Sequence, residues 1–110
     1  MRTIRSSREI DAMFRAARKA SHPLVMVLVS PTGREGAAEG RVAFVAGKRL
    51  GNAVWRNRAK RVLREAARRA GGPWAGLDVI LIARSGTANA RADELDAALL
   101  STLRRAEVRP

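Results

Sequence analysis

Residues 47–73 read GKRLGNAVWRNRAKRVLREAARRAGGP, and this stretch decides the fold. Asn52 is a residue type that caps helix N-termini, and Gly71-Gly72-Pro73 stops a helix, so the sequence predicts a helix over 53–70. At about 100° per residue, its apolar side chains fall on one stripe: Trp55, Ala59, Val62, Leu63, Ala66 and Ala70. The stripe predicts that this helix packs on a sheet and that Trp55 belongs to the core rather than to a base-stacking surface.

The opposite face of the predicted helix carries only cations and one amide. Its residues are Asn57, Lys60, Arg61, Arg64 and Arg68, with Arg56 and Arg58 at the flanks. Arginine outnumbers lysine six to one on this helix. A guanidinium is weakly hydrated and forks onto phosphate oxygens with two parallel hydrogen bonds, which indicates a phosphate-bearing partner.

The charge of the whole chain is concentrated in two segments. The chain of 110 residues has 22 basic and 10 acidic side chains, a net charge of +12. Residues 48–69 hold nine basic and one acidic side chain, and residues 1–22 hold six and two. Such unmixed positive charge opposes folding unless a polyanion is the neighbour, so we expect a nucleic-acid partner.

The sequence supports neither a membrane-spanning protein nor a function that depends on cysteine. The longest apolar run, 24–29, is far shorter than the roughly 20 residues that span a bilayer, and the N-terminal residues show no secretory signal. The apolar stripe of the basic helix is needed to cover a strand, so we expect no membrane partner. The absence of cysteine excludes disulfides, thiolate ligands and cysteine nucleophiles, and it is compatible with a reducing cytosol.

The remaining patterns predict one α+β domain over residues 1–110, a small α/β sandwich in the order α-β-β-α-β-α. Its other elements are a helix over 7–19 with a Ser6/Glu9 capping box, strands over 24–29, 41–46 and 78–83, and a last helix starting at Asn89 or Asp93. A turn over 31–36 (PTGREG) would join the first two strands as a hairpin.

No catalytic or metal site can be assembled from the sequence, so we expect neither. Glu9 and Asp11 diverge on their helix, and Asp93, Glu94 and Asp96 suit a helix N-terminus. The glycines before the basic helix match neither the Walker spacing nor the dinucleotide fingerprint, so we expect no cofactor on the protein.

The run beginning at Lys48 resembles the signature of the bacterial ribonuclease P protein family, K-[KR]-x-G-x-A-V-x-R-N-R-x-K-R-x-x-R-E. The matching residues are Lys48, Arg49, Gly51, Ala53, Val54, Arg56, Asn57, Arg58, Lys60, Arg61, Arg64 and Glu65. The resemblance extends to nearly the whole chain, including a D-x-x-x-x-A-R strand at Asp78, Ala83 and Arg84.

The resemblance implies the small subunit of a ribonucleoprotein that removes the 5′ leader from precursor tRNA in the cytoplasm. In that family the RNA carries the active site and its Mg²⁺ ions, and the protein binds the catalytic RNA and the leader. It also implies a left-handed strand-helix-strand crossover, which general topology rules do not predict. The residues expected to contact RNA are Lys48, Arg49, Asn52, Arg56, Asn57, Arg58, Lys60, Arg61, Arg64 and Arg68.

The family's leader cleft, between the first helix and the sheet, corresponds here to Ile10, Phe14 and Val27. Only one of these is aromatic, whereas the family usually has three, so apolar contact would carry more of the leader's positioning. Phe14 fits either a core or a cleft-lining role. The same charge and size would also suit a structural RNA-binding protein of ribosomal type, which remains the alternative.

Overall fold

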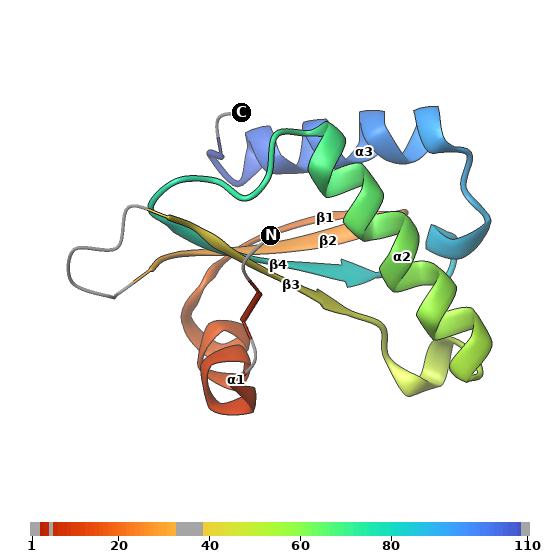
Figure 1. Ribbon diagram of the computed structural model, residues 1–110, viewed down its shortest axis with the longest axis horizontal. Coiled ribbons are helices and arrows are strands. Elements are labelled where there is room, and N and C mark those ends of the chain that lie inside the picture. The colour runs from red at the N-terminus through yellow and green to blue at the C-terminus, as the bar shows by residue number, and fades with distance from the viewer. Residues whose placement is uncertain (1–2, 5, 33–38, 109–110) are drawn as a thin grey trace.

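The computed structural model describes residues 3–4, 6–32 and 39–108, which form a four-stranded sheet with helices on both faces (Figure 1). Helix α1 lies on one face, and helices α2 and α3 cover the other. The elements are α1 (Ser7–Ala16), β1 (Arg18–His22), β2 (Val25–Pro31), β3 (Arg41–Val45), η1 (Lys48–Leu50), α2 (Ala53–Arg69), β4 (Leu77–Ala83), η2 (Thr87–Asn89) and α3 (Ala92–Arg105), where η marks a short 3₁₀ helix. This is an α+β fold in the order α-β-β-β-α-β-α.

Helix α2 confirms the prediction made from its stretch of sequence, ending one residue earlier. The Asn52 side-chain oxygen accepts a hydrogen bond from the backbone N–H of Trp55 at 2.9 Å, which caps the helix. Gly71 follows the helix end with φ +93°, a conformation that glycine adopts at little cost. The buried residues are Ala59, Leu63, Ala66 and Ala67, and Trp55 packs partly buried against the same core.

The predicted hairpin of β2 and β3 is wrong, because β4 lies between these two strands. The order across the sheet is β1-β2-β4-β3, with β4 antiparallel to β2 and parallel to β3. Strand β4 is buried along most of its length, so it needs a strand on each side and cover on both faces. The central position satisfies both requirements, and α2 becomes the crossover that joins the parallel neighbours β3 and β4.

The first helix was predicted to continue to residue 19, but it ends at Ala16, and 18–22 form an additional strand. Strand β1 pairs antiparallel with β2 over its whole length, from Arg18 opposite Val29 to His22 opposite Val25. Arginine, lysine and alanine are good helix formers, but the preference is worth little per residue, whereas the open edge of β2 supplies backbone partners to an extended chain. Tertiary pairing therefore overrides local propensity at this segment.

The two faces of the sheet bury separate hydrophobic clusters. Along β2, the side chains of Val25, Val27 and Val29 enter the larger cluster, beneath α2 and α3. Met26 and Leu28 point to the other face, where Leu28 joins the smaller cluster beneath α1. This alternation is the period of two that a strand imposes.

One further boundary differs from the sequence prediction, and one predicted turn cannot be compared. Helix α3 begins at Ala92 rather than at Asn89 or Asp93, because Asn89 belongs to η2 and the backbone N–H of Arg91 is bonded to the Glu94 carboxylate at 3.3 Å. The predicted turn over 31–36 lies for the most part outside the described residues.

Candidate nucleic-acid interface

The outer surface of α2 and the turn before it hold all ten residues that the sequence predicts to contact RNA. Helix α2 is placed by its apolar stripe on the larger core, so the residues between the buried positions point away from the sheet. Arg56 and Lys60 are half-buried, and the others are exposed: Lys48, Arg49, Asn52, Asn57, Arg58, Arg61, Arg64 and Arg68. The structure therefore brings the predicted residues together on one side of the molecule.

The cations of this surface are not neutralised by the protein. Lys48, Arg49, Arg56, Arg58, Lys60, Arg61, Arg64 and Arg68 form no ion pair with another residue in the described part of the chain. Six acidic side chains form ion pairs elsewhere: Glu9 and Asp78 with Arg41, Asp96 with Arg69, Glu107 with Arg18, and Asp93 and Glu94 with Arg91. A row of cations on one helix face is the arrangement expected at a polyanion-binding surface.

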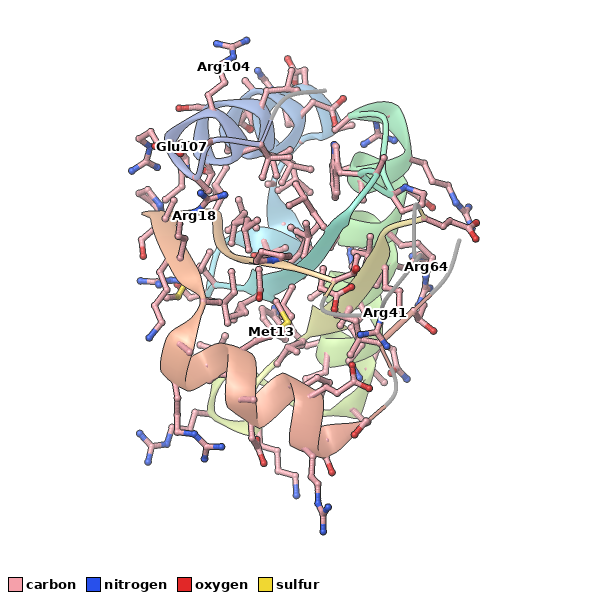
Figure 2. All side chains as sticks on the ribbon, turned by 90° about the vertical axis from the view of Figure 1, so that its left-hand side faces the viewer. Met13, Arg18, Arg41, Arg64, Arg104 and Glu107 are labelled. Atoms are coloured by element: carbon pink, nitrogen blue, oxygen red, sulfur yellow. The ribbon has the colours of Figure 1, made fainter. Side chains whose placement is uncertain are left out.

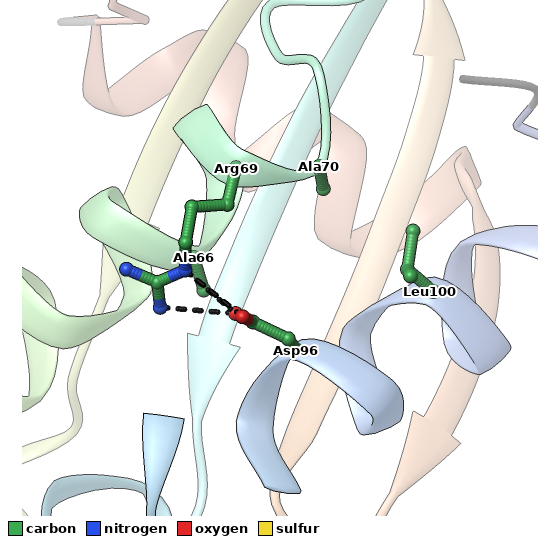
Figure 3. Close-up of a pocket in the computed structure, with 5 residues that line it drawn as sticks. All are labelled: Ala66, Arg69, Ala70, Asp96 and Leu100. Atoms are coloured by element: carbon green, nitrogen blue, oxygen red, sulfur yellow. Dashed lines mark hydrogen bonds and ion pairs between the residues drawn. The ribbon is translucent and has the colours of Figure 1, made fainter. Parts of the chain in front are cut away.

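Arg69 lies on the same helix but has a different role. Its guanidinium donates to both carboxylate oxygens of Asp96 on α3, with distances of 2.9–3.0 Å (Figure 3). The hydrogen bond to Asp96 raises the pKa of Arg69, and the carboxylate compensates its charge. Ala66, Ala70 and Leu100 complete the small hollow around this pair. Arg69 thus joins α2 to α3 and stands apart from the unpaired cations.

Two of the predicted RNA-binding arginines differ from the others in their surroundings. The Arg64 guanidinium carbon lies 5.2 Å from the ring centroid of Phe44 on β3, which is a cation–π contact. Arg56 is half-buried, and its Nε atom is buried without a hydrogen-bond partner among the described residues.

The residues predicted for the leader cleft do not share one surface, and the assignment of Val27 is wrong. Ile10 is half-buried on the α1 side of the sheet, and Phe14 is 38% exposed, which favours a surface role over a core role. Val27 is fully buried in the larger cluster, beneath α2 and α3. Adjacent strand residues face opposite sides, so Met26, next to Val27, lies on the α1 side, as the fully buried Leu28 does.

The α1 side of the sheet also carries a cation that the sequence prediction did not assign to a site. Arg84, just after β4, extends over Met26 with 3.9 Å between its Nη1 and the methionine sulfur. Ile82 and Val45 are half-buried on the same face. Arg84 belongs to the D-x-x-x-x-A-R pattern, so the signal was present in the sequence, but only the pairing of β2 with β4 shows which side chain it covers.

Helix α1 is fastened to the sheet by Met13 and by a charged network. Met13 is buried against the smaller cluster, and Figure 2 shows its side chain between α1 and the sheet. Arg41 on β3 donates to both oxygens of Asp78 on β4, at 3.1 and 2.7 Å, and also to Glu9 on α1. These hydrogen bonds, to Asp78 first and to Glu9 second, raise the pKa of Arg41 further above its usual value.

The described residues contain neither a cluster of metal ligands nor a membrane-spanning helix. Within residues 3–4, 6–32 and 39–108, no three His, Cys, Asp or Glu side chains lie together as metal ligands would. No helix in that part of the chain has the length and hydrophobicity needed to cross a membrane.

The comparisons with known proteins agree on one family. The family model for ribonuclease P matches residues 1–107. The chain is 38% identical over 96 residues to the ribonuclease P protein component of Gluconacetobacter diazotrophicus, covering 86% of this chain and 83% of that one. It is 36% identical over 106 residues to that of Herpetosiphon aurantiacus, covering 96% and 84%.

The fold agrees with the sequence relatives. The solved structure of the Staphylococcus aureus RNase P protein superimposes with a TM-score of 0.82 at 22% identity, covering 98% of this chain and 97% of that one. Because the family model spans nearly the whole chain and the relatives exceed 30% identity over most of it, the protein belongs to the bacterial ribonuclease P protein family.

Proposed function

We propose that this protein is the RNA-binding subunit of ribonuclease P and that it holds the catalytic RNA on the outer face of α2. The observation that carries the proposal is the row of arginines and lysines that no acidic residue of the described chain neutralises. A folded RNA supplies phosphates at a density that matches such a row, and release of its counterions drives binding.

The second RNA contact in this proposal is the 5′ leader of precursor tRNA, on the α1 side of the sheet. Phe14 is the exposed aromatic there, and an aromatic ring can stack on a base for roughly 1–3 kcal/mol. Met26 and Arg84 replace Val27 in this role, because they reach that face and Val27 does not. The leader would then meet one ring, one flexible apolar side chain and one cation.

In this proposal the chain is not the catalyst. The Mg²⁺ ions and the active site belong to the RNA, and no step of cleavage is assigned to a protein side chain. Among the described residues, no three metal-ligating side chains lie together. Since precursor tRNA is made and processed in the bacterial cytoplasm, that is the compartment in which this function would operate.

The test of the proposal is reconstitution with a bacterial ribonuclease P RNA at low Mg²⁺ concentration. We expect the protein to stimulate removal of the leader from a precursor tRNA and to be inert when assayed without the RNA. Absence of stimulation would favour a structural RNA-binding protein of ribosomal type. Reproducible cleavage by a nuclease-free preparation of the protein alone would overturn the assignment of catalysis to the RNA.

The location of the interface can be tested with matched arginine variants on the same helix. Arg58→Gln and Arg64→Gln each remove an unpaired cation, whereas Arg69→Gln removes a cation that Asp96 already compensates. Each lost phosphate contact lowers the slope of log affinity against log salt by about 0.7–0.9. We expect this flattening for Arg58 and Arg64 and little change for Arg69.

The same salt titrations can also contradict the proposed location of the interface. Equal slopes for the Arg58, Arg64 and Arg69 variants would show that the outer face of α2 is not the surface that meets RNA phosphates. Thermal unfolding of each variant, measured alongside, separates loss of binding from loss of fold.

A further inference from the structure

One apolar side chain stands out on the cationic surface of α2. Val54 is 77% exposed, whereas the other large hydrophobic residues that are exposed in the described chain, Phe14 and Leu50, reach 38% and 36%. Val54 belongs to neither hydrophobic cluster. Its two methyl groups face solvent beside a row of arginines.

Folding does not explain a valine at this position. The cap of α2 is made by Asn52 with Trp55, so Val54 has no capping role. A β-branched side chain loses rotamer freedom in a helix, and alanine would be the better helix former at an exposed position. An isolated exposed valine is ordinary on a protein surface, so its meaning depends on the groups that lie beside it.

Val54 shares a hollow with three polar residues of its own helix. Asn57, Arg58 and Arg61 follow it at spacings of three, four and seven, so the four side chains form one stripe. They line an open hollow on the outer face of the helix. Within the described chain, none of the three polar side chains has a hydrogen-bond or ion-pair partner.

The chemistry of this stripe differs from that of a purely phosphate-binding surface. Phosphate oxygens accept hydrogen bonds only, so they have no use for the amide oxygen of Asn57 or the methyl groups of Val54. A nucleobase matches both groups, because its flat face can lie on the methyl groups and its edge carries donors as well as acceptors. Arg58 and Arg61 then lie where the adjoining phosphates would be bound.

We propose that this hollow receives one unpaired nucleotide of the RNA partner. The base lies on Val54, its edge bonds to the Asn57 amide, and Arg58 and Arg61 bind the flanking phosphates. The nucleotide is unpaired because bases in an A-form helix are stacked, with a deep and narrow major groove that side chains cannot enter. This inference rests on the proposed function, and it adds a contact that is not electrostatic.

The variant Val54→Ala tests the proposal without disturbing the fold, since the side chain is mostly exposed and alanine favours the helix. We expect its affinity for a folded bacterial ribonuclease P RNA to fall roughly four- to fifteenfold, as for one or two methylene groups removed from an apolar contact. The salt slope should not change, because no charge is lost. Val54→Ile keeps the branched apolar group and should bind like the parent.

The same variants are then compared in their binding to a fully paired RNA duplex of similar length, which has no unpaired nucleotide. Val54→Ala should bind this duplex as the parent protein does, while Arg58→Gln should weaken binding to both RNAs and flatten both salt slopes. An equal loss on the duplex would refute the unpaired nucleotide, since the valine would then contact the sugar edge of a helix.

Two outcomes separate the failure of this inference from the failure of the proposed function. If Val54→Ala binds the folded RNA like the parent while Arg58→Gln flattens the slope, the RNA interface stands and the hollow serves another occupant, such as a protein. If Arg58→Gln also leaves affinity and slope unchanged, the proposed function itself is wrong.

Discussion

Replacing Arg41 is expected to be the most damaging single loss of charge in this protein. Its side chain is 11% exposed and is bonded to Asp78, which is 7% exposed, and to Glu9, which is 46% exposed. Arg41→Met preserves most of the volume but leaves the Asp78 carboxylate buried without its cation. An uncompensated buried charge costs far more than a broken surface pair, because water cannot replace the lost partner.

The exposed fractions of these side chains determine how much stability each substitution should cost. Breaking a buried ion pair from one side costs roughly 3–5 kcal/mol, and we expect about 3 kcal/mol here because Glu9 keeps the network open to solvent. Glu9→Gln breaks the half-exposed arm of this network and should cost less than about 1 kcal/mol. A domain of this kind has roughly 5–15 kcal/mol of stability, so Arg41→Met should remain folded but be clearly weakened.

Urea denaturation measures both variants. With a denaturant dependence of roughly 1–3 kcal/mol per molar, the midpoint of Arg41→Met should fall by at least about 1 M. Adding Asp78→Asn to Arg41→Met removes the stranded charge and should recover part of the loss. A midpoint for Arg41→Met close to that of Glu9→Gln, or a double variant that only sums the single losses, would refute this reasoning.

Two further predictions concern single contacts. Thr87→Val removes a buried hydroxyl that donates to the Leu24 carbonyl at 2.6 Å and accepts from the Arg84 N–H at 2.7 Å, so stability should fall by roughly 2–4 kcal/mol in the same denaturation assay. Phe44→Leu removes the ring beside the Arg64 guanidinium and should weaken RNA affinity roughly two- to fivefold at unchanged salt slope. Because the ring acts through that guanidinium, Phe44→Leu should have no further effect in an Arg64→Gln background; an effect of the same size there would contradict the coupling.

The candidate site was predictable to the extent that it lies on one helix. The cap at Asn52, the stop at Gly71 and the apolar stripe are signals within a few residues of one another, and they place every predicted cation of 53–70 on the outer face. What they could not show is the partner of each cation. Arg69 and Arg68 are adjacent in sequence, and only the packing of α3 against α2 brings Asp96 to the former.

The surface under α1 was not predictable to the same extent, because it is assembled from several strands. The sequence prediction assigned Val27 to this surface, but Val27 is buried on the opposite face of the sheet. Neighbouring residues of a strand face opposite sides, so an error of one position exchanges the two faces. Arg84 was visible as part of a pattern, but its position over Met26 follows from the register of β2 with β4.

By itself, the sequence determined the basic helix, its ends, its outward cations and the family to which the chain belongs. The tertiary structure alone decided that β4 separates β2 from β3, that 18–22 are extended, and which acidic residue each arginine meets. The physical reason is the range of the interactions. Helix caps and amphipathic periodicity act within a few residues, whereas strand order and ion pairing join residues distant in sequence and are settled only when the whole core is buried.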